Sequence, residues 1–318
     1  MPNLTQSQIN ARMLHAAEIG DLASVLFLAP NSTNLANSRQ NAVRTPLLVA
    51  AANGHLDIVT ALLPWVLDGE GENFSVFEAL DSAIFGGQVD CARSLAAALG
   101  PSCFSRSNGA QRAAKLLGHA IDAPKNETAS LLIVFDLVGE DRRNALADNA
   151  LRHAAKVQKP DFLRILLPFS EPNSQDADGC TALILSCSPL GNGAPPPDGR
   201  ATEFLLPVSD PGIQNSFGNT AWDVAMWHDA WPCVDALAVD RLRRNPDDAK
   251  LRAFLGREKA RLPKASAFLQ AEELAAVVRA VSQNTGSQRE QTTPNLSAAA
   301  VASLAPRTST AGPTAKRL

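Results

Sequence analysis

The chain has 318 residues, and its 45% hydrophobic content is high enough to supply a buried core, which excludes a wholly disordered protein. A formal net charge of −3 gives no general attraction to nucleic acid or to anionic membranes. The odd number of cysteines, five, argues against a disulfide framework and favours a reducing compartment.

The first predicted helix pair covers residues 14–30, LHAAEIGDLASVLFLAP. The clearest pair follows at 45–64, TPLLVAAANGHLDIVTALLP. In this second pair, Thr45 is a suitable N-cap because its hydroxyl can accept from an amide of the first helical turn. Gly54 suits the left-handed stop between the two helices. Small residues such as Ala50 allow a neighbouring helix to approach closely.

The same pattern recurs along the chain with a period of about 32 to 39 residues. Further copies lie at 80–97, 117–134, 151–168, 180–207 and 219–240, and the copies at 80–97 and 117–134 are degenerate. A helix pair of this size is apolar on one side only and needs neighbours of the same design. We therefore predict an all-α solenoid of about seven helix-turn-helix units over residues 11–244, after an N-terminal extension at 1–10.

Three motifs, TPLLVAAANGHLDIVTALL (45–63), DADGCTAL (176–183) and SFGNTAWDVA (216–225), resemble the ankyrin repeat family. The resemblance implies antiparallel helix pairs with projecting hairpins, serving protein–protein recognition. The chain departs from the family at one position, where the usual His of the helix start is replaced by Leu48, Arg152, Ile184 and Asp223. The family's local hydrogen bonds from that His are therefore expected to be missing in these units.

Two more helices are predicted over residues 245–282, where they would cover the exposed end of the stack as a cap. Leu274, Val277 and Val278 are among the apolar residues expected to provide this cover. Residues 283–318 lack aromatic residues and are rich in Ser, Thr, Pro and Ala, so we predict a disordered tail. Residues 188–200, SPLGNGAPPPDGR, interrupt the sixth unit either as a tolerated surface insertion or as a loop that contacts a partner.

Three histidines, His15, His119 and His153, occupy the same position of their units. Packed helices lie about 8–10 Å apart, whereas a zinc ligand needs a nitrogen about 2.0–2.1 Å from the ion. We therefore predict helix-packing roles for these residues, with no metal and no cofactor. The sequence also lacks a nucleophile elbow, an HExxH motif, a phosphate loop and a dinucleotide fingerprint, which predicts a non-enzymatic protein.

The candidate partner-binding residues come from the predicted hairpin tips and from the end of a first helix. They are Gln40, Asn41, Arg44, Asp176, Asp178, Gln214, Phe217 and Trp227. Trp227 has two interpretations, because it is either an aromatic anchor for a partner or a residue packed beneath the C-terminal helices.

The function predicted from the sequence is a protein-binding scaffold, monomeric and cytoplasmic, with no signal peptide and no transmembrane segment. One alternative is a bacterial effector that is exported by a route other than Sec and acts on a host protein. Another is a nucleic-acid-associated regulator that uses the basic residues of 241–264. The identity of the partner does not follow from the sequence.

Overall fold

The computed structural model describes residues 5–32, 44–67, 74–100, 104, 109–124, 128–138, 140–191 and 193–291. The chain divides into two compact units, Met1–Ala265 and Ser266–Leu318. All regular structure in the described residues is helical, as the sequence predicted. None of the described helices has both the length and the apolar content needed to cross a membrane.

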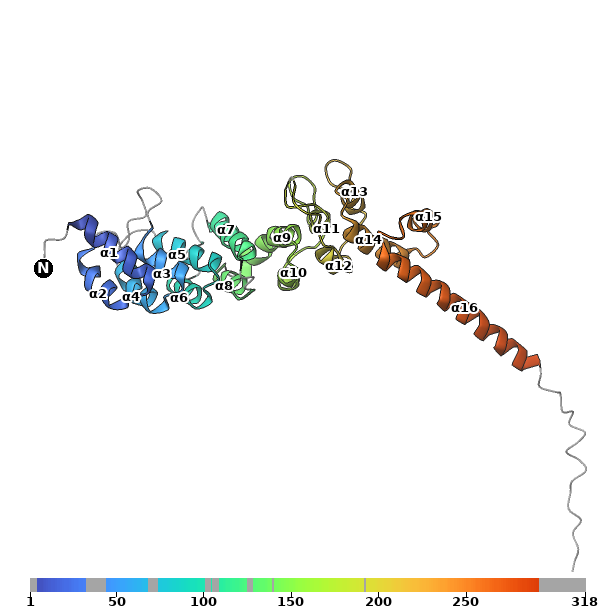
Figure 1. Ribbon diagram of the computed structural model, residues 1–318, viewed down its shortest axis with the longest axis horizontal. Helices are drawn as coiled ribbons and strands as arrows, with labels where there is room; N and C mark the ends of the chain where they lie inside the picture. Colours follow the sequence, from blue (N-terminus) through green and yellow to red (C-terminus); the bar gives the residue numbers. More distant parts are fainter. Residues whose placement is uncertain are drawn as a thin grey trace, which may run out of the picture. The chain divides into compact units, whose positions relative to one another are not determined.

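Most of the first compact unit consists of helix pairs that follow one another along the chain (Figure 1). We number them as units one to seven, and the described residues contain these pairs: α1 (Gln6–Ile19) with α2 (Leu22–Leu28), α3 (Pro46–Asn53) with α4 (Leu56–Leu67), α5 (Phe74–Phe85) with α6 (Val89–Leu99), α7 (Gly109–Asp122) with α8 (Thr128–Val138), α9 (Glu140–Lys156) with α10 (Pro160–Leu166), α11 (Ala182–Ser186) with α12 (Arg200–Leu205), and α13 (Ala221–Trp227) with α14 (Trp231–Arg244). Short 3-10 turns, η1 (Ala29–Asn31) and η3 (Leu167–Phe169), extend α2 and α10.

The pairs stack in two layers. The first helices contact one another in the order α1, α3, α5, α7, α9, α11 and α13, and second helices such as α2, α4, α6 and α8 do the same. Ala50 and Ala51 of α3 are fully buried between neighbouring first helices, as predicted for small contact residues. The sequence prediction of an all-α solenoid of helix-turn-helix units is confirmed.

Hydroxyl side chains start several first helices. Thr45, Thr181 and Thr220 each accept a hydrogen bond from the amide three residues later. Thr5 does the same for α1 and forms a reciprocal capping box with Gln8. Because this box begins α1 at Gln6, the N-terminal extension is shorter than the predicted 1–10.

A side chain at the start of several second helices bonds back to the preceding unit. The Nε2 of His55 donates to Glu18 O at 3.1 Å, and the Nε2 of Gln88 donates to Ala52 O at 3.4 Å. These carbonyls lie at the ends of first helices, where no intrahelical amide is available to them.

Lys159 fills the same role in unit five, where its Nζ donates to Ile121 O and, at 3.1 Å, to Ala123 O. Burial lowers the pKa of Lys159. The repeated bond therefore joins each of these units to the one before it.

A buried polar cluster joins units six and seven. The hydroxyls of Ser186 and Thr202 lie 2.8 Å apart, and Thr202 Oγ1 donates to Cys233 Sγ at 3.3 Å. The hydrogen bond to Cys233, together with burial, raises the pKa of the Cys187 thiol. Cys187, Cys233 and Cys91 of unit three are all buried, where each acts as a small apolar core residue. Cys103 lies outside the described residues.

Two helices follow unit seven, namely α15 (Ala249–Glu258) and α16 (Pro263–Gln291). Leu251 and Leu255 of α15 are buried, and Phe254 makes an edge-on contact with Trp222 at 5.7 Å between ring centroids. The first turn of α16 is capped by Asp235 of α14, whose two carboxylate oxygens accept from the amides of Lys264 at 2.9 Å and Ala265 at 2.8 Å.

Two expectations for the C-terminal region differ from the structure. Leu274, Val277 and Val278, which were expected to be covered, are 66%, 59% and 56% exposed. In addition, α16 continues to Gln291, so the predicted disordered tail 283–318 begins with helix. No proline occurs between Pro263 and Pro294 to stop the helix earlier.

Candidate protein-binding surface

The loops that lead into units six and seven are built alike, and we call them hairpin six (residues 175–180) and hairpin seven (residues 214–219). In hairpin six, Asp176 Oδ1 accepts from the amides of Asp178 at 3.0 Å and Cys180 at 2.8 Å. In hairpin seven, Asn215 Oδ1 accepts from the amides of Phe217 and Asn219, both at 3.0 Å. This turn chemistry places Asp178 and Phe217 at equivalent exposed positions.

The two hairpins are bonded to each other. The amide of Ser216 donates to Asp178 O at 2.9 Å. The Gln175 Nε2 donates to Gln214 O at 3.0 Å and to Gly179 O at 2.7 Å. Figure 1 shows both loops projecting on the same side of the helix pairs, above α11 and α13. The tip residues are therefore presented by a fixed backbone.

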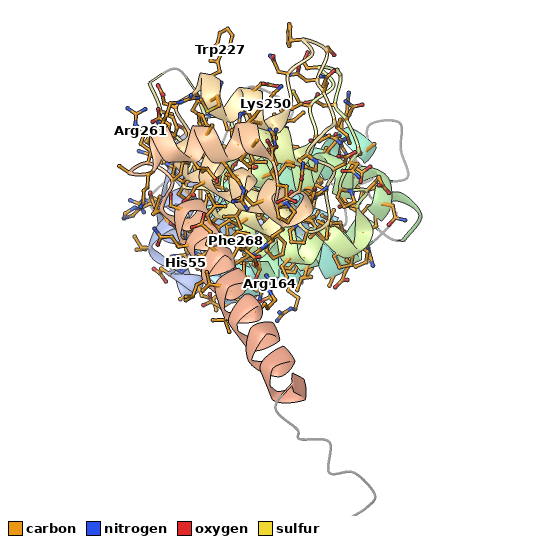
Figure 2. All side chains as sticks on the ribbon, turned by 90° about the vertical axis from the view of Figure 1, so that its right-hand side faces the viewer. His55, Arg164, Trp227, Lys250, Arg261 and Phe268 are labelled. Carbon is orange, nitrogen blue, oxygen red and sulfur yellow. The ribbon has the colours of Figure 1, made fainter. Side chains whose placement is uncertain are left out.

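Trp227, the last residue of α13, is 81% exposed, so packing beneath the C-terminal helices, one of its two predicted roles, is wrong. Figure 2 shows its side chain pointing away from the rest of unit seven. The other two tryptophans of the unit are partly covered. Arg241 lies over the Trp222 ring at 5.9 Å from the centroid, and Arg261 lies over the Trp231 ring at 4.6 Å.

A second part of the surface is hollowed between α3, α5 and α7. A hollow of about 420 Å³ is lined by six residues: Ala52, Asp81, Ser82, Phe85, Gly86 and His119. A neighbouring hollow of about 330 Å³ lies between α7 and α9 and also includes His119. Phe85 is 50% exposed here, so an apolar group is available to a partner.

Charged pairs line these hollows. The buried carboxylate of Asp81 accepts from Lys115 Nζ at 2.8 Å and lies 2.5 Å from His119 Nδ1. His153 Nε2 lies 2.8 Å from Asp122 Oδ1. Each of these histidines is thus held by a carboxylate of the preceding unit. Nowhere in the described part of the chain do three metal-ligating side chains come together.

Residues 13–106 match the family model for ankyrin repeats in three copies. Over these residues the chain carries ankyrin repeats. Two crystal structures are similar to it: the human ASB11 ankyrin repeat domain (17% identity, TM-score 0.48, covering 72% of this chain and 96% of that one) and the ankyrin repeat domain of Bcl-3, a member of the IkappaB protein family (16% identity, TM-score 0.47, 71% and 97%). None of the curated proteins compared with the chain matches it significantly.

The predicted partner-binding residues fall into three groups. Gln40 and Asn41 lie outside the described residues. Arg44 is exposed, 3.9 Å from Glu18 of unit one. Asp176, Asp178, Gln214 and Phe217 lie together in hairpins six and seven, with Trp227 on the helix that follows.

Sequence reasoning missed the acid–imidazole pairs on the ankyrin surface. Asp81 and His119 form one pair and are 38 positions apart in the sequence. Asp122 and His153 form the other and are 31 positions apart. The only available signal was an acid roughly one repeat period before each histidine.

Four cations of the basic segment 241–264 are paired with acids of units six and seven or of α15 and its N-cap. Arg241 lies 2.7 Å from Asp248, Arg244 lies 2.8 Å from Asp240, and Arg261 lies 3.5 Å from Glu258. Lys264 also pairs with Glu203. These pairs lower the net positive charge that the segment presents to solvent.

Proposed function

We propose that this protein is a non-enzymatic scaffold that binds another protein through hairpins six and seven and the exposed ends of the first helices. The observation that carries the proposal is the exposure of two aromatic side chains. Phe217 (79%) and Trp227 (81%) are the most exposed large hydrophobic residues in the described part of the chain. Aromatic residues are the commonest anchors of protein interfaces.

Two further observations support the same face. Ankyrin repeats are generally protein–protein interaction modules. The hollows beside Phe85 and His119 add concave surface on the first-helix layer. The hydrogen bonds between the hairpins keep this surface in one conformation, which lowers the entropy that binding must remove.

Photo-crosslinking tests the proposal in the full chain. A benzophenone amino acid would replace Phe85, Phe217 or Trp227 on the first-helix side, and Phe27 or Leu132 on the second helices as matched exposed controls. In lysate of the source cells, discrete crosslinked proteins are expected at the first three positions and not at the controls. Crosslinks confined to Phe27 and Leu132, or the same products at all five positions, would contradict the proposal.

The nucleic-acid alternative receives less support, because the ion pairs of Arg241, Arg244, Arg261 and Lys264 already use charge that phosphate binding requires. Retention on nucleic acid at low ionic strength that is lost at high ionic strength would revive it. No feature of the described residues favours the effector alternative, which concerns the site of action rather than the binding surface.

A further inference from the structure

The charge of residues 170–231, from the loop before hairpin six to the first residue of α14, differs sharply from that of the rest of the chain. Residues 170–231 contain eight acidic residues and one basic residue, Arg200, a net charge of −7. Because the whole chain carries −3, the remaining residues sum to +4. The acidic residues are Glu171, Asp176, Asp178, Asp198, Glu203, Asp210, Asp223 and Asp229.

Several of these carboxylates remain available on the surface. Arg200 forms an ion pair with Asp198, at 2.6 Å, and Glu203 forms an ion pair with Lys264. By contrast, the exposed carboxylates of Asp178 and Asp229 have no cationic partner among the described residues. Residues 170–231 therefore remain anionic after these ion pairs are counted, and the basic last turn of α14 lies outside this stretch.

Each exposed aromatic lies beside such carboxylates. Phe217 follows Ser216, whose amide is bonded to the Asp178 backbone, so Phe217 and Asp178 are neighbours at the hairpin tips. Trp227 lies two residues before Asp229, an acid without a cationic partner in the described part of the chain. It also lies one helical turn after Asp223, whose carboxylate caps α13 by accepting from the amide and hydroxyl of Thr220. An aromatic face next to a carboxylate suits a guanidinium or ammonium group, which gains both cation–π attraction and an ion pair.

The chain itself shows this chemistry in the same unit. Trp222 and Trp231 are each covered by an arginine, Arg241 and Arg261 respectively. Trp227 is the remaining tryptophan of the unit, and it is open to solvent. An arginine from another protein would complete at Trp227 the arrangement that the chain makes for the other two.

Resting on the function proposed above, we propose that hairpin seven, Asp178 and the exposed end of α13 bind an arginine- or lysine-rich segment of the partner protein. The basic residues stack on Trp227 and Phe217 while the surrounding carboxylates neutralise them. A second copy of this chain fits less well, because four cations of its basic segment, Arg241, Arg244, Arg261 and Lys264, are already used in internal pairs.

A labelled peptide of alternating Arg and Ser tests this surface directly, with fluorescence anisotropy measured on the full chain at low ionic strength. A peptide with citrulline in place of Arg has the same shape without the charge. The Arg peptide is expected to bind and the citrulline peptide to bind at least about tenfold more weakly, because both the ion pairs and the cation–π contacts are lost. Binding of the Arg peptide should weaken as salt is added.

Single variants then locate the site. Trp227→Ala is expected to weaken binding of the Arg peptide about tenfold, and Phe217→Ala or Asp178→Asn about threefold. The matched controls are Trp65→Ala, an exposed tryptophan of α4, and Asp136→Asn, an exposed acid of α8, which should leave affinity unchanged. Circular dichroism melting of each variant verifies that the fold is retained.

Equal affinity for the citrulline peptide, absence of binding, or unchanged affinity in Trp227→Ala would each overturn the basic-segment proposal. Self-association that Trp227→Ala abolishes would also overturn it, by making a second copy the occupant. If a partner protein is crosslinked at Phe217 but the peptide test fails, only the basic-segment proposal is rejected and the scaffold function stands. Loss of every first-helix crosslink rejects the scaffold function itself.

Discussion

In units two, three and five, the residue that starts the second helix bonds back to the first helix of the preceding unit, through His55, Gln88 and Lys159. In units six and seven, the same position is Gly199 or Ala230, and neither has a polar side chain to make that bond. These two units are joined instead by bonded hairpins and by a buried hydroxyl–thiol cluster.

The difference shows that neighbouring units of one solenoid can be held together by two kinds of contact. In units two, three and five, the contact is a side-chain hydrogen bond to a backbone carbonyl. Where Gly199 stands, the backbone of α14 comes so close that an added Cβ would lie 2.8 Å from Pro232 O. In units six and seven, the hydrogen bonds between the two hairpins themselves hold neighbouring units together.

The largest expected effect tests close packing in the N-terminal units. Ala51→Leu should lower the free energy of unfolding by about 1–3 kcal/mol, because the buried site between first helices has no room for the added atoms. The equivalent residue of unit seven is Met226, which is only half-buried. Met226→Leu, a substitution of similar volume, is the matched control and should cost clearly less in chemical denaturation.

A smaller effect tests the bonded hairpins. Gly179 and Gly218 have φ values of 73° and 79° at the same turn position of hairpins six and seven. A Cβ on Gly179 would lie 2.8 Å from the Ser216 amide nitrogen, whereas nothing lies within 4 Å of one on Gly218. Both Ala variants carry about 1–2 kcal/mol of left-handed strain, so Gly179→Ala should melt lower than Gly218→Ala. Equal melting temperatures would show that contact between the hairpins contributes nothing.

Each side-chain hydrogen bond between units should contribute less to the free energy of unfolding than the two features above. Gln88→Ala removes one long hydrogen bond to Ala52 O and should cost about 0.5–1 kcal/mol. Gln111→Ala, at an exposed position of α7, is the control and should change the unfolding free energy little. If the two variants unfold at the same denaturant concentration, this hydrogen bond does not stabilise the N-terminal units.

The last prediction concerns reactivity rather than stability. The hydrogen bond to Cys233 and burial keep the pKa of Cys187 well above that of a free thiol, so little thiolate exists at neutral pH. Burial also raises the pKa of the half-buried Cys180. Iodoacetamide should therefore modify native Cys180 increasingly as pH rises above neutral, and Cys187 only after denaturation, as read by peptide mass spectrometry. Rapid modification of native Cys187 would show that the cluster opens.

The repeat array was predictable because its signals are local. Thr45 and Gly54 act within their own unit, and a small residue recurs at the position of Ala50, so their spacing predicted helix starts, turns and close contacts that the structure contains. The aligned threonines Thr181 and Thr220 cap the later first helices in the same way.

The remaining features depend on groups far apart in the chain. The pairing of Asp81 with His119 needs side-chain orientations that repeat alignment does not supply. The apolar spacing of Leu274 and Val278 is the same whether that helix face is covered or exposed, so their exposure did not follow from the pattern. The alternative roles of Trp227 could be separated only by its exposure in the structure.

The carboxylate of Asp235 determines where the chain can be shortened. It is 3% exposed and its two hydrogen-bond donors, the amides of Lys264 and Ala265, belong to the first turn of the last helix. A protein ended at Arg261 would keep the acid and discard both donors, leaving a buried anion unsolvated within the seventh unit. A terminus placed beyond Ala265 would retain both donors. The first turn of the last helix is therefore needed by unit seven, although most of that helix is exposed.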